Sequence, residues 1–123
     1  YDYANQHTDY MIATGSINHD GFTSRASNIS TEVNASAVAE NVAKDYPTAK
    51  VTFEKWVASS GHRKNIEGDF THTAVSVKKD ASGHYYYTQL FYDSKALNMS
   101  LILNLHKSML HPDLMVSRWM KYS

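Results

Sequence analysis

The chain has no cysteine and no excess of charge of either sign, and each absence limits its function. Without cysteine there is no thiol nucleophile, and disulfides give no information about the redox compartment. Twelve basic and twelve acidic residues give a formal net charge of zero, with no basic stripe or acidic tail. The electrostatics therefore argue against binding to nucleic acid or to an anionic membrane.

A long hydrophobic run and a phosphate-binding glycine loop are also missing. The longest apolar stretch, residues 97–110, is interrupted by polar residues, so it is too short and too polar to span a bilayer. No signal peptide is recognisable, because Tyr1 already lies within a helical pattern. Ser59 and Ser60 lie close to His62 in sequence, but nothing resembling a nucleophile elbow surrounds them.

The length and composition predict a single domain over residues 1–123, large enough to bury roughly two-thirds of its unfolded surface. A first helix ends at Gly15, and its core face includes His7, which is predicted to be a buried histidine. Residues 16–37 are rich in Ser, Asn and Thr and predict a long loop that carries His19. Because long loops in small domains are usually functional, His19 is a candidate site residue.

The middle of the chain predicts a capped helix followed by a β-hairpin. Thr48 caps the helix, and Gly61 ends it. The helix has an apolar stripe that consists of Ala49, Phe53, Trp56 and Val57. A short turn is predicted over residues 64–68. Alternation over residues 73–79 predicts one strand, with Val75 and Val77 on one face, and the aromatic segment over residues 85–92 predicts a second. Residues 80–83 supply the turn between them.

The last part of the chain predicts two helices. The first covers residues 97–109 and is stopped by Pro112, and the second covers residues 114–123 but has no natural end. If Ser123 ran into Tyr1, the apolar positions would keep the phase of one continuous helix. Three explanations remain open, namely a circular permutation, a fragment of tandem domains, and helix exchange between chains.

Several segments together resemble the CAP superfamily, also called SCP-like, and in particular its cysteine-free bacterial branch. The resemblance runs almost continuously over residues 7–92, through HTDYM, INHDGF, AENVA, WVASSGHRKNI, FTHTAVSV and YYYTQLFY. It implies an α+β fold, a three-layer α-β-α sandwich, in which AENVA forms a short strand. Relatives open with helices similar to residues 96–123 of this chain, which implies a circular permutation relative to them.

The resemblance also implies a polar cavity. Many relatives bind a divalent metal with two His and two Glu. His19 and Glu40 match one of each, whereas the other two positions hold Ser59 and Tyr86, and His62 is the histidine that the bacterial branch adds. His19 and His62 are therefore the metal ligands expected for a weakly bound Zn²⁺ or other divalent metal, and Glu40 could ligate, orient a histidine or act as a base.

Each of these residues also has a structural alternative. His19 could be a loop histidine bonded to backbone, and His62 could cap a helix or bond the Glu40 carboxylate. Tyr86 could belong to the core instead of lining the pocket.

The function implied is a secreted or cell-envelope binding module whose cavity holds a divalent metal or a small ligand. A metal-assisted hydrolase using His19, His62 and Glu40 is the first alternative, with Glu40 the candidate catalytic residue, and a lipid or sterol carrier is the second. The expected partner is a protein or a small molecule. The expected state is a monomer, with a helix-exchanged dimer as its alternative.

Overall fold

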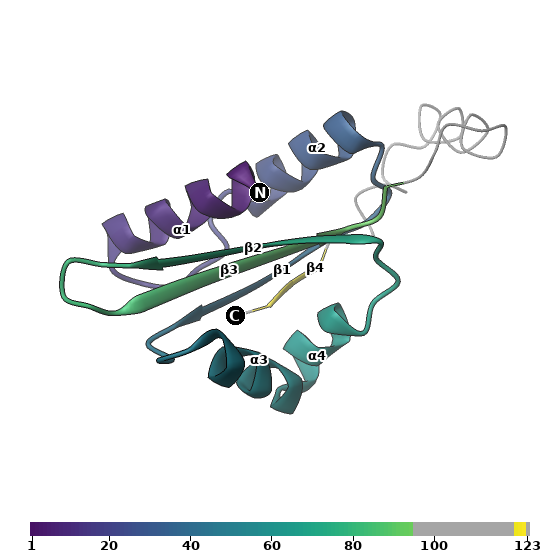
Figure 1. The fold of residues 1–123 in the computed structure, drawn as a ribbon. Helices are drawn as coiled ribbons and strands as arrows, with labels where there is room; N and C mark the ends of the chain where they lie inside the picture. The colour runs from purple at the N-terminus through teal and green to yellow at the C-terminus, as the bar shows by residue number, and fades with distance from the viewer. Residues whose placement is uncertain (95–119, 123) are drawn as a thin grey trace, which may run out of the picture.

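The computed structural model describes residues 1–94 and 120–122, and these form the predicted α+β sandwich in three layers (Figure 1). Helices α1 (Asp2–Thr14) and α2 (Phe22–Val33) cover one face of the sheet, and α3 (Ala49–Ala58) and α4 (Ser60–Ile66) lie on the other. The sheet has the order β2-β3-β1-β4. Its strands are β1 (Val38–Lys44), β2 (His72–Lys79), β3 (Tyr85–Tyr92) and β4 (Met120–Tyr122).

Strand β1 is the centre of the domain. It pairs antiparallel with β3 over its full length and parallel with β4 over Ala39–Asn41. Side chains alternate across a strand, so Val38 packs with Leu90 under α2, whereas Ala43 packs with Tyr87 against α3. Both faces of β1 are therefore buried, and the strand implied for AENVA is confirmed.

The first helix and the hairpin are confirmed. Gly15 ends α1 in the left-handed conformation, at φ 76°, where glycine is favoured. The strands β2 and β3 pair from His72–Tyr92 to Lys79–Tyr85, as predicted. Val75 and Val77 share a face but are 41% and 44% exposed, because β2 is an edge strand that lies beyond α3 and α4.

The prediction of one long loop over residues 16–37 is wrong, because α2 occupies most of it. The segment is polar, and its Ser and Asn residues favour turns when they are judged locally. The helix forms because a narrow face, Phe22, Ala26, Ile29 and Ser30, is buried against the sheet. Only residues 15–21 remain as the loop that carries His19.

The boundary between α3 and α4 also differs from the prediction. Thr48 caps α3 as expected, by accepting a hydrogen bond from the Val51 N–H at 3.1 Å. The helix ends at Ser59, whose extended backbone (φ −96°, ψ 121°) starts α4, and Gly61 and residues 64–66 lie inside α4. Of the predicted stripe only Trp56 is buried, since the helix contacts the sheet through Thr52 and Trp56 while Phe53 is exposed.

The predictions for the last segment are tested only at residues 120–122. These residues form β4, so the helix predicted over 114–123 is wrong there, and so is a helix continuous through Tyr122 into Tyr1. Pairing with β1, which is distant in sequence, overrides the local helical pattern. The helix predicted over 97–109 lies outside the described residues, and the circular permutation stays a prediction.

Candidate functional site

The Glu40 carboxylate lies at the centre of the polar groups on the α1–α2 side of the sheet. It is 0% exposed, in the middle of β1. Arg25 of α2 donates to both of its oxygens, from Nε at 2.9 Å and from Nη2 at 2.8 Å. His19 Nδ1 lies 2.8 Å from Oε1. A buried charge requires this kind of pairing, because an unpaired carboxylate in the interior costs several kcal/mol.

The bond to Glu40 fixes the orientation of the His19 ring. A carboxylate only accepts hydrogen bonds, so His19 donates from Nδ1 and its Nε2 carries the lone pair in the neutral ring. The loop that holds His19 is itself fixed, since His7 Nε2 donates to the Asn18 carbonyl at 2.7 Å. Gly15 and Gly21 bracket the loop in left-handed conformations.

His62 of α4 forms a second pair with Ser59, the residue that precedes this helix. Its Nδ1 lies 2.8 Å from Ser59 Oγ, and its ring stacks on Trp56 with the centroids 6.2 Å apart. The side-chain amide of Asn41 donates to the His62 carbonyl at 3.2 Å, and the Asn65 amide donates to Asn41 Oδ1 at 2.9 Å. These bonds hold the start of α4 against β1.

The Nε2 atoms of His19 and His62 share an unusual property. Both are buried, and neither has a hydrogen-bond partner within the described part of the chain. Burial lowers the pKa of His62, and repulsion from the His19 imidazole when that ring is protonated lowers it further. Each ring therefore has a buried nitrogen whose hydrogen-bonding capacity is not met within the described residues, and of the two histidines only His62 lines the cavity described next.

A cavity of about 280 Å³ lies beside β1, next to the stretch that β4 pairs with. Ser59 and His62 line it together with two lysines, two aromatic rings and apolar groups; these are Ile17, Val42, Ala43, Lys44, Tyr46, Lys55 and Trp56. No carboxylate is among these lining residues. The lysines that line the cavity therefore give it basic charge on an otherwise largely apolar wall.

The predicted site residues thus form two pairs and one outlier. His19 contacts Glu40, and His62 contacts Ser59. Tyr86 is buried with Met11 and Val42, and Lys44 Nζ lies 5.2 Å from its ring centroid. Tyr86 therefore belongs to the core on the α1 side and is not among the residues that line the cavity.

Sequence reasoning missed Arg25, the partner of Glu40. It lies in α2, which was expected to be a loop. The available signal was Glu40 itself, because a carboxylate between apolar residues of a buried strand must find a cation. The sequence does not identify which cation, since the contact joins residues that are 15 positions apart through the packing of α2 on the sheet.

Burial also predicts a pH dependence of stability. Burial lowers the pKa of His7 below its ordinary value of 6.5, and this outweighs the opposite effects of the Glu40 carboxylate and the Asn18 carbonyl. Below about pH 6.5 the unfolded chain therefore binds a proton that the folded chain does not, so the free energy of unfolding falls with falling pH until the folded pKa is reached. We expect His7→Gln, which keeps a donor for Asn18, to reduce this slope in urea unfolding at pH 7.5 and 5.5.

The matched control for this measurement is His72→Gln, which removes an exposed imidazole on β2. A slope that is equally steep in wild type and His7→Gln would contradict the role given to His7. His62, whose pKa burial also lowers, would then account for the slope, since its sign is the same.

The residues present fit a metal ion only in part. Two neutral imidazoles with free Nε2 atoms can bind Zn²⁺, and a carboxylate bonded to the other nitrogen of one ring is a usual second contact. Within the described residues, however, no group of three His, Cys, Asp or Glu side chains is placed to hold a metal. Ser59 and Tyr86, at the positions of the missing ligands, do not complete the set.

These features define a class, an α-β-α domain with a small cavity beside its central strand that is lined by His62, by two lysines and by apolar side chains. Residues 1–91 match the CAP family, described as the cysteine-rich secretory protein family, and the chain belongs to this family. No curated protein and no solved structure matches the chain. No helix in the described residues is long and apolar enough to cross a membrane.

Proposed function

We propose that this domain is a secreted or cell-envelope binding module that holds a small polar ligand in the cavity beside β1. The observation that carries the proposal is the buried Nε2 of His62, which has no partner within the described residues although it belongs to a residue lining the cavity. A buried polar atom normally has a partner, so a ligand that donates or accepts a hydrogen bond there would complete it. Secretion is proposed from the secretory character of the family.

The arrangement around the cavity supports binding over catalysis. Ser59 holds the His62 ring, and Asn41 and Asn65 hold α4, so the groups that face a ligand are fixed before it arrives. Glu40, the candidate base, has both oxygens engaged by Arg25 and one also by His19. A carboxylate that is 0% exposed and fully engaged is poorly placed to take a proton from water.

A ligand screen tests this proposal. We expect saturation-transfer NMR against a library of small polar metabolites to give ligands that bind the wild type and are lost in His62→Ala. Lys64→Ala is the matched control, because Lys64 is an exposed residue of the same helix that does not line the cavity. Ligands that bind wild type and His62→Ala equally would contradict the proposal. Turnover of a peptide or ester library would also contradict it, if Glu40→Gln abolishes the turnover while circular dichroism shows that this variant is still folded.

A divalent metal between His19 and His62 is the second candidate ligand, and the two unpartnered Nε2 atoms favour it. A site with two imidazoles would be weak, because structural zinc sites normally use four protein ligands and catalytic sites three. Zinc calorimetry on the wild type and on His19→Ala decides between the candidates. Heat of binding at micromolar zinc that disappears in His19→Ala would support a metal site at these histidines. If the wild type gives no heat, the domain does not bind zinc and the polar ligand remains the candidate.

The lipid-carrier alternative has less support. The cavity of about 280 Å³ is just below the roughly 300–1,000 Å³ of pockets that enclose drug-sized ligands. Two lysines, a serine and a histidine line it, which suits a polar molecule better than a sterol. Lipid extraction from the purified protein, followed by mass spectrometry, checks this alternative directly.

A further inference from the structure

Strand β2 is an outer edge of the sheet, and within the described residues only β3 pairs with it. Its eight residues exceed the average length of a strand, about five or six, and they include neither proline nor glycine. Such an edge presents a row of unpaired backbone N–H and C=O groups. The edge of β2 is therefore a template on which another strand can pair.

The outward backbone groups of β2 belong to its odd-numbered residues. The Asp80 N–H donates to the His84 carbonyl at 2.9 Å, immediately after the last paired residue of β2. Bonded and non-bonded pairs alternate along an antiparallel ladder, so the even-numbered residues of β2 bond to β3. The odd-numbered residues direct their N–H and C=O groups away from the sheet; these are Thr73, Val75, Val77 and Lys79.

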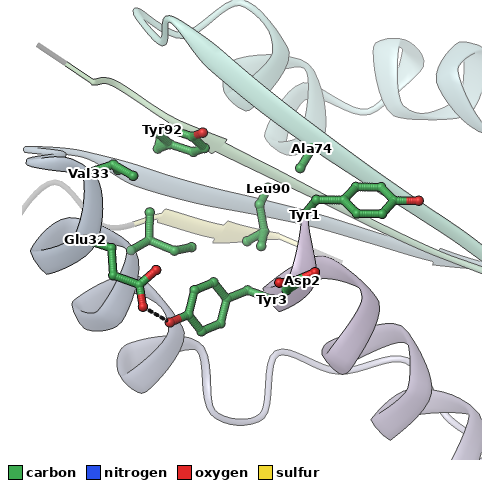
Figure 2. Close-up of a pocket in the computed structure, with 9 residues that line it drawn as sticks. Tyr1, Asp2, Tyr3, Glu32, Val33, Ala74, Leu90 and Tyr92 are labelled. Atoms are coloured by element: carbon green, nitrogen blue, oxygen red, sulfur yellow. Dashed lines mark hydrogen bonds between the residues drawn. The ribbon is translucent and has the colours of Figure 1, made fainter.

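The side chains of β2 alternate between a covered face and an open face. Ala74 and Leu90 point toward α1 and α2 (Figure 2), and Ser76 is buried on the same side. Val75 and Val77 point to the other face, where they are exposed because β2 lies beyond α3 and α4. The edge thus carries two apolar side chains beside its free backbone groups.

The charges that usually protect an edge strand are turned away from this one. Lysine side chains on an edge normally discourage pairing with another chain. Here Lys78 Nζ binds the Asp9 carboxylate of α1, at 2.8 and 3.0 Å. Lys79 Nζ lies 5.2 Å from the centroid of the Tyr85 ring on β3. Both ammonium groups are therefore drawn toward groups of their own chain.

We propose that a second copy of this chain pairs with β2, antiparallel and two-fold symmetric, with the axis at Ser76. In this register Val75 lies opposite the partner's Val77, so four valines form one apolar cluster on the open face. The odd-numbered residues of the two strands exchange their free N–H and C=O groups. The contact is isologous, since each copy contributes the same edge, and it needs no exchange of helices.

The same register is compatible with the charges of the strand. Thr73 lies opposite the partner's Lys79 on the open face, and Ala74 lies opposite the partner's Lys78 on the covered face. No like charges therefore stand directly opposite each other, which would weaken the pairing. Because one pair of strands is a small interface, the dimer is weak and forms only at high protein concentration. The proposal is independent of the cavity beside β1.

Sedimentation velocity tests for the dimer. We expect the wild type to change from monomer to dimer between about 10 μM and 1 mM. Val77→Lys places a charge opposite an apolar side chain twice in each dimer, so it should weaken the dimer about tenfold or more. Phe53→Lys is the matched control, because Phe53 is an exposed apolar residue of α3, away from this edge. A wild type that stays monomeric at about 1 mM, or equal weakening by Phe53→Lys, would overturn the proposal.

Cysteine cross-linking tests the register, since the chain has no cysteine of its own. In the proposed register the Cα atoms of Val75 and the partner's Val77 are about 5.5 Å apart, which a disulfide can span. An oxidised mixture of Val75→Cys and Val77→Cys should therefore give mixed cross-links in excess of random pairing. Mixed cross-links at or below the random share would contradict the register.

Val75→Pro tests the backbone contribution. The Val75 N–H is directed away from β3, so proline at this edge position should leave the fold intact by circular dichroism. The same change removes a donor from the interface, so we expect no dimer at the concentrations that give one for the wild type. A folded Val75→Pro that dimerises as tightly as the wild type would show that the edge of β2 is not the contact.

Discussion

Replacing Glu40 by glutamine is expected to lower the free energy of unfolding by about 3–5 kcal/mol, because it leaves the Arg25 guanidinium partly buried without a counter-charge. Arg25 makes two hydrogen bonds to the carboxylate, and its side chain is only 11% exposed. The His19 bond is weakened in the same variant, so the loop before α2 loses its attachment to β1. Urea unfolding followed by circular dichroism measures the loss.

Two variants show whether the unpaired cation causes this loss. Glu67→Gln removes an exposed carboxylate that lies 3.2 Å from Arg63, and it should change stability by less than about 1 kcal/mol. Arg25→Met in the Glu40→Gln background removes the unpaired charge, so it should recover part of the loss. A Glu40→Gln variant that loses less than about 1 kcal/mol would mean that the pair is not buried as described.

The hairpin could be predicted from the sequence because its information is local. Residues 73–79 alternate in part between polar and apolar, residues 85–92 are rich in aromatic β-formers, and residues 80–83 have turn chemistry. The Asp80 carboxylate accepts from the N–H groups of Ser82 and His84, both at 2.9 Å, which closes the turn. Local chemistry and tertiary pairing agree here, and the prediction is confirmed.

The segments that were predicted wrongly depend on distant partners. The polar sequence of α2 becomes helical because four of its side chains pack on the sheet, and Met120–Tyr122 becomes a strand because β1 has an open edge. Neither partner can be found from the segment itself. Local patterns therefore give the hairpin but not α2 or β4.

The candidate site, like the fold, was predicted only in part from the sequence. The resemblance to the CAP family implied that His19 and Glu40 share a cavity region, and the structure brings them within 2.8 Å. Arg25, Asn41 and Asn65 were not predicted, because their roles depend on how α2 and α4 pack against β1. The resemblance supplies residue types at fixed positions, whereas the partners of those residues follow from the packing of this chain.

Trp56→Ala is expected to lower the free energy of unfolding by about 3–5 kcal/mol, which is the usual cost of truncating a buried aromatic residue. The ring packs with Ala43 and Tyr87 and is 5% exposed, so the truncation leaves a hole between α3 and the sheet. The indole also donates to the Val42 carbonyl at 3.3 Å, at the edge of β1 next to the cavity.

Trp56→Phe separates the packing from this hydrogen bond. It keeps most of the ring but leaves the Val42 carbonyl without its donor, so we expect a loss of about 1–2 kcal/mol. Because the Trp56 ring also supports His62, the alanine variant should lose the ligands found in the NMR screen, while the phenylalanine variant keeps them more weakly. If Trp56→Ala binds the ligands as tightly as the wild type, the ligands do not bind in this cavity. The Trp56 ring that positions His62 would then not be needed for binding, which would contradict the proposed function.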